Sequence, residues 1–444
     1  MTSKTPREGS LEAPRRHPLE WQTEAFYDSA ALTQELERVF DICHGCRRCF
    51  SLCNAFPTLF DAIDATDGGE LEGVPKKVYW EVVDQCYLCD MCFMSKCPYV
   101  PPHEWNIDFP HLMLRAKATR FREEGAGWRE RVLADTDGVG KIAGIPVVAE
   151  IVNVVNSSAA GRALLEKTLG IARDAPLPEF HSRTGRSRIG EETSGSPPVA
   201  VNGTTGRVVL FTTCYGNRNL PQMVEDLVAV YRHNGIHVAL AGTEVCCGMP
   251  KLELGDLQSV AEARDVNVPE LARWVSEGWD IVASVPSCVL MFKQELPLMF
   301  PDDADVRRVA EAFFDPFEYL ALRQKGGAVR TDFPQPLGKV AWQVPCHLRV
   351  QNIGLKTKEV LEWVPGTTVQ PIERCSGHDG TYGVKLRFRE ASKKIAQPAA
   401  NRIRDASADH FTSDCPMAGA QLDVARAADD YAHPLSLLRK AYGI

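Results

Sequence analysis

Eight cysteines in two short runs constrain the fold of this 444-residue chain more than any other feature. The first run reads CHGCRRCFSLC and the second reads CYLCDMCFMSKCP. Their cysteines are Cys43, Cys46, Cys49 and Cys53 in the first run, and Cys86, Cys89, Cys92 and Cys97, followed by Pro98, in the second. Three cysteines spaced three residues apart can wrap a tight loop around three corners of one compact inorganic group. The fourth ligand of such a group must come from elsewhere in the chain.

These spacings are typical of two-cluster ferredoxins, in which the last cysteine of each run binds the cluster of the other run. We therefore expect two [4Fe–4S] clusters, one on Cys43, Cys46, Cys49 and Cys97, and the other on Cys86, Cys89, Cys92 and Cys53. Zinc is an alternative, but structural zinc prefers two Cys-x2-Cys pairs separated by a longer loop. The third cysteine of each run would then be left over. Inert buried cysteines would reach this register only by chance.

The composition indicates a globular protein outside the secretory pathway. Hydrophobic residues make up 44% of the chain and charged residues 24%, and the net charge of -8 argues against a nucleic-acid partner. The N-terminus has no apolar segment of the secretory type, and the weakly charged run over 142–161 is too polar for a comfortable membrane span. We expect a cytoplasmic protein. In that reducing compartment, fifteen cysteines indicate metal binding or redox chemistry rather than disulfides.

Apolar spacing predicts helices around the two cysteine runs, at 29–40 and 106–124. We expect a flexible tail over 1–20 and an all-helical ferredoxin-type domain over 21–125. A helical connector is expected over 126–179, and a linker rich in Ser, Gly and Thr over 180–206.

The other seven cysteines each follow a segment with the pattern of a buried strand. Strands alternate with helices, which indicates α/β units with a mostly parallel sheet. Matching cysteines are separated by 132, 129 and 127 residues, so we expect a duplication, with one unit over 207–330 and a second over 331–444. Cysteines after parallel strands converge on the edge where open α/β sheets bind ligands. They are Cys214, Cys246, Cys247 and Cys288 in the first unit, and Cys346, Cys375 and Cys415 in the second.

Ordinary buried cysteines are the alternative explanation for these seven residues. The adjacent pair Cys246–Cys247 before Gly248 argues against it in the first unit, because two thiols and a glycine suit close approach to a bulky cofactor.

The cysteine patterns, with PCHLRVQNIG, CSGHDGTYGVK and HPLSLLRKA in the second unit, resemble a family of iron–sulfur subunits. The family includes the C subunit of anaerobic glycerol-3-phosphate dehydrogenase and the iron–sulfur subunits of heterodisulfide reductase and glycolate oxidase. The resemblance covers nearly the whole chain. It implies an α + α/β fold, with a helical two-cluster domain and two fused Rossmann-like units of the cysteine-rich CCG type. It also implies an electron-transfer subunit of an oxidoreductase complex. Such a subunit relays electrons between a flavoprotein dehydrogenase, or another redox partner, and a quinone or further acceptor.

A complete unit in the disulfide-reducing relatives has five cysteines, and this sequence departs from that pattern. Met291 stands where we expect the last cysteine of the first unit, and Ser376 and Ala418 replace two cysteines of the second. Four thiolates in the first unit suffice for a third cluster. Three in the second would need His347, His378, Asp379 or an exogenous ligand, and the two histidines are equally well explained as hydrogen-bonding residues.

Two other functions stay open. One is a thiol or disulfide reductase of the heterodisulfide type that uses a cluster in the first unit. The other is a redox-sensing or scaffold protein with a metal-free α/β half. The chain lacks the dinucleotide-binding glycine motif, so NAD or FAD is expected on a partner.

Apolar helical faces over 107–122 and 142–171 predict at most a peripheral contact with the inner face of the cytoplasmic membrane. Packing of these faces against the cluster domain or a partner is the alternative.

Overall fold

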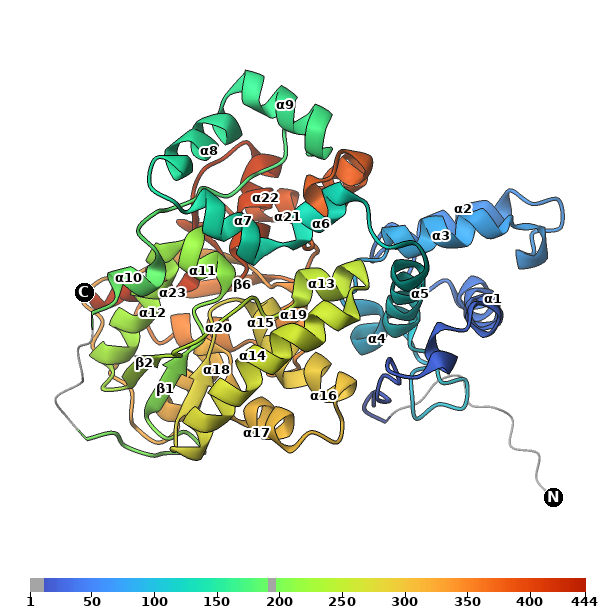
Figure 1. Cartoon of the computed structure of the whole chain (residues 1–444). Coiled ribbons are helices and arrows are strands. Elements are labelled where there is room, and N and C mark those ends of the chain that lie inside the picture. Colours follow the sequence, from blue (N-terminus) through green and yellow to red (C-terminus); the bar gives the residue numbers. More distant parts are fainter. Residues whose placement is uncertain (1–11, 191–196) are drawn as a thin grey trace. The chain divides into compact units, whose positions relative to one another are not determined.

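The computed structural model describes residues 12–190 and 197–444. The chain forms two compact units (Figure 1). The first comprises residues up to Gly127 together with Lys251–Leu257, and the second comprises Trp128–Pro250 and Gln258–Ile444. Helices together with two parallel four-stranded sheets agree with the expected α + α/β class. The finer domain boundaries stay predictions.

The first unit is helical in its described residues. Its elements are η1 (Glu24–Tyr27), α1 (Ser29–Cys46), α2 (Ala55–Asp64), η2 (Leu71–Gly73), α3 (Lys76–Gln85), α4 (Met91–Ser95) and α5 (Phe109–Glu124). Asp28 caps α1 by accepting the Ala31 N–H at 2.6 Å, and the apolar stripe of α1 is buried. Rings from three helices meet beside the cysteine runs, with Phe56 and Phe109 centred 4.7 Å apart. This aromatic core holds α1, which carries Cys43 and Cys46, against α2 and α5.

The tail expected over 1–20 is anchored where the structure describes it. The Arg16 guanidinium donates to both carboxylate oxygens of Asp90 at 2.7 Å and to Asp108 at 2.9 Å, and all three side chains are largely buried. The Arg15 N–H donates to the Pro101 carbonyl. Flexibility is therefore wrong for residues 12–20, because a buried guanidinium needs these carboxylates. The rest of the predicted tail, 1–11, lies outside the described residues.

The second unit begins with the helical connector α6 (Trp128–Ala134), α7 (Thr136–Ala143), α8 (Val148–Ser157) and α9 (Ala159–Leu169), followed by α10 (Gly185–Arg188). Residues 191–196 of the predicted linker lie outside the described residues. Over 12–190 and 197–444, no single helix has the length and apolar composition of a membrane span. Only α7 and α8 taken together do, and they meet at 109°.

Two parallel sheets with the same strand order follow the connector. The first has the order β2-β1-β3-β4 and the second β6-β5-β7-β8. The strands are β1 (Arg207–Leu210), β2 (His237–Leu240), β3 (Asp280–Val282) and β4 (Phe313–Phe314), then β5 (Lys339–Gln343), β6 (Thr368–Ile372), β7 (His410–Ser413) and β8 (Tyr431–Ala432). The repeated order is what an internal duplication produces.

Helices connect the strands in both repeats. The first has α11 (Cys214–Arg218), α12 (Pro221–His233), α13 (Met249–Leu254), α14 (Leu257–Ser276), α15 (Pro286–Leu290), the π-helix η3 (Met291–Glu295), α16 (Leu296–Met299), α17 (Ala304–Ala312) and α18 (Pro316–Gln324). The second has α19 (Cys346–Arg349), α20 (Lys356–Leu361), η4 (Tyr382–Val384), η5 (Leu386–Phe388), α21 (Arg389–Ala406), α22 (Pro416–Arg426) and α23 (Pro434–Tyr442).

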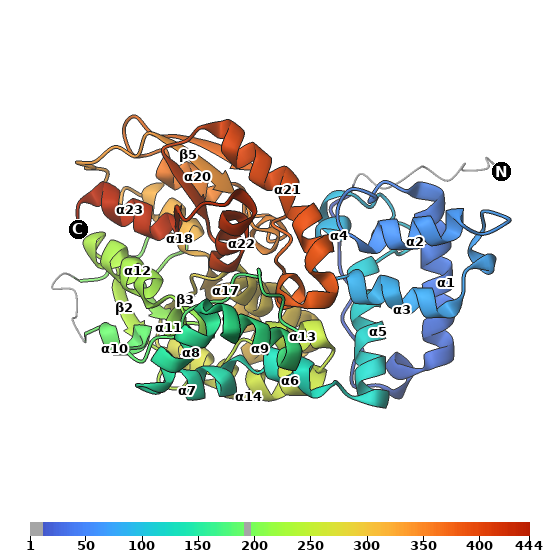
Figure 2. The same ribbon diagram turned by 90° about the horizontal axis from the view of Figure 1, so that it is seen from above.

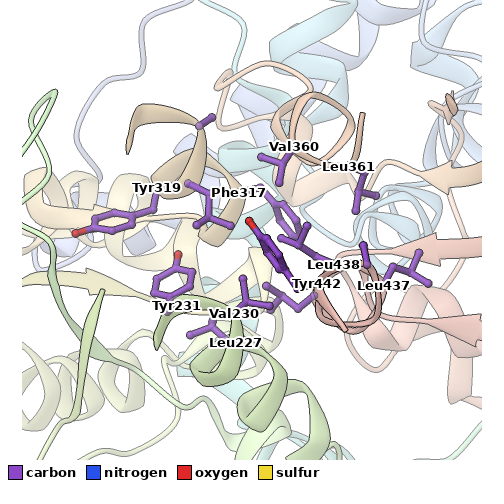
Figure 3. Close-up of a cluster of buried hydrophobic side chains, with 14 of the residues drawn as sticks. Leu227, Val230, Tyr231, Phe317, Tyr319, Val360, Leu361, Leu437, Leu438 and Tyr442 are labelled. Atoms are coloured by element: carbon purple, nitrogen blue, oxygen red, sulfur yellow. The ribbon is translucent and has the colours of Figure 1, made fainter. Parts of the chain in front are cut away.

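The two repeats share one hydrophobic core. Helix α12 of the first packs beside α23 of the second (Figure 2), and α18 packs on α20. Figure 3 shows side chains from all four helices pointing into this core, among them Leu227, Tyr231 and Leu438. Arg439 of α23 also donates to the buried Asp226 carboxylate of α12 at 2.8 Å. The two sheets are therefore joined into one body through their helices.

Candidate iron–sulfur sites

The two cysteine runs turn by the same local geometry. The residue after the second cysteine of each run is left-handed, Arg47 with φ 51° and Asp90 with φ 61°. Residues other than glycine rarely adopt this backbone conformation unless neighbouring groups stabilise it. Arg47 is held by the Asp64 carboxylate and Asp90 by the Arg16 guanidinium. An ion pair thus braces each loop in the turn that brings its cysteines together.

The first group of thiols consists of three cysteines of the first run and the last cysteine of the second. All four line one cavity, together with Phe56, Phe60 and Tyr99, and each is half-buried. Burial, then repulsion from Cys97 and Cys46, raises the pKa of the Cys49 thiol to about 12. Burial likewise raises the pKa of Cys97 to about 11. Thiols crowded in this way become thiolates when cations bind among them, with release of protons.

The second group has the complementary membership. Cys92 is buried, and its pKa is raised by burial and by the charges of neighbouring thiols, first Cys49 of the first group and then Cys89, Cys86 and Cys53. Cys86 is also buried, which raises its pKa to about 12. Lys117 of α5 lies beside it and donates from Nζ to the Cys86 carbonyl. This group therefore lies deeper than the first and has a cation next to one of its thiols.

Lys117 is contacted by the segment 251–257, which lies between β2 and β3 in the sequence but belongs to the helical unit in the structure. Gly255 has φ +88°, and a Cβ on it would lie 2.5 Å from the Lys117 carbonyl carbon. Only glycine fits such an approach at this φ. Glu253 contributes a nearby negative charge that favours the Lys117 ammonium. No pattern in the sequence indicates that residues 251–257 belong with the helical unit.

The four cysteines of the first α/β repeat form a third group. The Cys214 and Cys246 sulfurs are 4.0 Å apart, and Cys246 also accepts hydrogen bonds from the Cys247 thiol and the Gly248 N–H. Cys247 in turn lies against Cys288. The donated hydrogen bonds lower the pKa of Cys246 well below its usual value, whereas those of Cys214 and Cys247 are raised. Gly248 has φ +97°, which lets its N–H point back at the sulfur.

Two residues of the connector complete this group, and sequence reasoning missed both. The Asp137 carboxylate accepts the Cys246 N–H at 2.7 Å. The Thr136 hydroxyl is buried and has no hydrogen-bond partner within the described residues, and it lies near the sulfurs of Cys214 and Cys246. Both residues lie at the start of α7, more than a hundred positions before the doublet in the chain. No local pattern marks them.

Strand register corrects the expected pairing of cysteines between the repeats. Val208 of β1 pairs with Asp280 of β3, and the equivalent Val340 of β5 pairs with His410 of β7. Counting on from these partners makes Val285 equivalent to Cys415, and Cys288 equivalent to Ala418. The prolines that begin α15 and α22 agree with this match. The prediction that Met291 replaces a cysteine is therefore wrong. Val285 stands in place of the first cysteine of a Cys-x2-Cys pair, and Cys288 is the second cysteine of that pair.

The second repeat holds its three cysteines in different surroundings. Burial raises the pKa of the Cys415 thiol to about 12, and Asp379 and Asp414 add negative charge beside it. The Gly377 N–H donates to the Cys375 sulfur at 3.3 Å. Tyr215, directly after Cys214, lies near both Cys214 and Cys415, so the cysteine edges of the two repeats face each other.

The two histidines named by the sequence differ in their contacts. His347 Nδ1 is hydrogen-bonded to the Ser287 hydroxyl at 2.8 Å, which ties the repeats together. His378 is buried, and neither ring nitrogen has a hydrogen-bond partner within the described residues. Burial and the Arg389 charge lower the pKa of His378 to about 4, so the ring is neutral. A neutral imidazole of this kind suits ligation better than the engaged ring of His347.

Sulfur donors around a cavity match the ligand chemistry of iron–sulfur clusters. Within 12–190 and 197–444, no three His, Cys, Asp or Glu side chains stand close enough together to hold a single metal ion.

Comparison with known proteins finds a matching family model for each of the two repeats. Residues 208–293 and 340–423 match the CCG cysteine-rich domain. The chain is 26% identical over 338 residues to the C subunit of anaerobic glycerol-3-phosphate dehydrogenase from Escherichia coli K12, covering 76% of this chain and 82% of that protein. It is 27% identical over 394 residues to the B subunit of the CoM/CoB fumarate reductase from Methanothermobacter marburgensis, covering 84% and 66%. Lactate utilization protein A of Bacillus cytotoxicus matches at 25% over 219 residues, covering 47% and 87%. These findings confirm the expected family resemblance.

Proposed function

We propose that this chain, with its two cysteine-rich CCG domains, is an iron–sulfur electron-transfer subunit of an oxidoreductase complex. The observation that carries the proposal is the pair of four-thiol groups in the helical unit. Each joins three cysteines of one run to the last cysteine of the other, which is the ligand set of a two-cluster ferredoxin-type domain. Two [4Fe–4S] clusters are the cofactors that this arrangement fits.

The relatives support the assignment to a complex, since two of them are named as subunits of a dehydrogenase and of a reductase. We propose a flavoprotein dehydrogenase or another redox subunit as the partner, and a quinone or further acceptor for the electrons. The first thiol group is half-buried beside Phe50, whose side chain is 55% exposed, whereas two cysteines of the second group are buried. A partner would therefore exchange electrons at the first group, and the second would relay them inward.

The first α/β repeat, a Rossmann-like unit in this proposal, is assigned a third cluster on Cys214, Cys246, Cys247 and Cys288. These thiols already contact one another in sequence order, and a cubane needs four ligands. The second repeat, with Ser376 and Ala418 in place of thiols, is assigned none or a labile one. A fourth ligand there would be His378, since it is buried without a partner.

A peripheral membrane contact is proposed for the connector. Helix α5 buries its apolar side chains, so the first predicted segment, 107–122, is explained by the core. The second segment is exposed: Ile142 is 66% accessible and Val154 64%, with Ile145, Val147 and Ile151 also exposed on α7, α8 and the turn between them. A face of this kind suits the boundary between lipid headgroups and acyl chains.

Iron analysis of the intact protein tests the central proposal. Protein purified without oxygen is expected to be brown and to contain at least about eight irons per chain, four for each cubane. Zinc in place of iron after reconstitution would contradict it. Partner subunits that co-purify with the untagged complex would then identify donor and acceptor.

A further inference from the structure

The cluster pocket of the first α/β repeat has a wall outside the CCG domain. That domain spans residues 208–293, whereas α7 of the connector begins at Thr136. Helix α7 is packed against α11, the helix that starts at Cys214. Gly140 and Gly144 make this packing close, because a Cβ on either would meet the Arg218 side chain, at 3.4 Å and 2.6 Å.

Two bonds aim the first turn of α7 at the cysteines. Asp137 holds the backbone of the doublet through the Cys246 N–H at 2.7 Å. Asp135 caps the helix by accepting the Gly138 N–H at 3.1 Å, so the hydroxyl of Thr136 has no part in capping. It is buried, it has no hydrogen-bond partner within the described residues, and it lies near the sulfurs of Cys214 and Cys246.

We propose that Thr136 is a positioning residue that donates the single hydrogen bond of its hydroxyl to the ligand sulfurs, shared between Cys214 and Cys246, and so sets the reduction potential of the first-repeat cluster. This inference rests on the third cluster of the proposed function. A donor at a ligand sulfur withdraws electron density and favours the reduced state, whose sulfurs are more negative. The hydroxyl therefore raises the potential.

Redox titration of the intact protein, followed by EPR, tests this role. Thr136→Val keeps the shape and removes only the donor, so iron content is expected to be unchanged and the potential lower. The potential shifts only by the difference in strength of this bond between the reduced and the oxidised cluster, and we expect that difference to be at most about a tenfold change in equilibrium constant. For a one-electron couple, a tenfold change is about 59 mV. Thr136→Ser is expected to keep the wild-type potential, as is the matched control Thr168→Val, whose hydroxyl bonds the Leu164 carbonyl on the exposed side of α9.

The outcomes separate the two proposals. A wild-type protein whose iron is confined to the helical unit would overturn the third cluster itself. A third cluster whose potential is the same in Thr136→Val and wild type would overturn only the role of the hydroxyl. If Thr136→Val loses iron and Thr136→Ser retains it, the contact between the hydroxyl and the sulfurs is supported, because the serine variant keeps the hydroxyl and the valine variant lacks it. Equal loss from both variants would overturn it.

Discussion

Exchange of the fourth ligand between the two cysteine runs leads to a sharp prediction. Cys97 lies in the second run, yet its thiol lines the cavity of Cys43, Cys46 and Cys49. Cys53 lies in the first run, yet it is among the thiols whose charges act on Cys92. Cys97→Ala should therefore damage the cluster of the first run, and Cys53→Ala that of the second. Alanine is preferred to serine because a serine oxygen can stand in as a ligand.

The magnitude follows from the ligand count. Each group supplies four thiols, so either variant leaves three for a cubane that needs four. We expect loss of about four irons from each variant, or conversion to a labile three-iron form. The other cluster keeps its full ligand set and its iron.

Reference variants turn the assay into a comparison of spectra. Cys46→Ala and Cys89→Ala remove cysteines whose cluster assignment does not depend on exchange. In EPR spectra of the reduced proteins, Cys97→Ala should lose the same cluster signal as Cys46→Ala. Cys53→Ala should lose the same signal as Cys89→Ala. Cys375→Ala, in the second repeat, controls for loss of a thiol and should match wild type. The reasoning is refuted if Cys97→Ala instead matches Cys89→Ala.

Four further outcomes are expected. Lys117→Met should lower the potential of the second cluster, by redox titration, because a buried positive charge that favours the added electron is lost; an unchanged potential would contradict this. Gly255→Ala should lower the free energy of unfolding by about 2 kcal/mol through its backbone clash, more than Gly235→Ala, which has a similar φ but open space; equal losses in denaturant unfolding would count against the clash. Cys247→Ser should remove about four irons from the intact chain whereas Cys375→Ser changes little, and the reverse would make the second repeat the functional site. High salt or carbonate should release the protein from membranes, and a need for detergent would disprove peripheral attachment.

The sequence predicted the sheets better than their edges. The strand expected before each cysteine or cysteine pair of the two repeats coincides with one of β1, β2, β3, β5, β6 and β7, because each of these segments is a short run with apolar and β-branched residues. Strands β4 and β8 were not predicted. Each is two residues long, at Phe313–Phe314 and Tyr431–Ala432, which is too short for a period-2 pattern to appear. They extend the sheets only because the neighbouring strand is already in place.

The site residues show a similar limit. Thiol spacing grouped the first eight cysteines because three ligands of each group are local in sequence. Thr136 and Asp137 depend on how α7 packs against α11, which no local pattern encodes. Offsets between cysteines suggested that Cys288 and Cys415 are equivalent. The strand pairing instead makes Cys288 equivalent to Ala418, about one helical turn further along the chain than Cys415, and no offset between cysteines could reveal this.

The shared core explains why a repeat that lacks ligands still matters to one that has them. Leu227, Val230 and Tyr231 of α12 are fully buried against α23 and α18, and Val360 and Leu361 of α20 extend the same cluster (Figure 3). Burial of one such side chain is worth about 1.5–3 kcal/mol, so exposing these residues would cost as much as the whole stability of many domains. The first repeat thus depends on the second for its fold. The second repeat has Ser376 and Ala418 where cysteines are expected. Their presence leaves that support intact, because neither residue belongs to this core. The second repeat can therefore lack a full ligand set and still hold Cys214 and Cys288 in place.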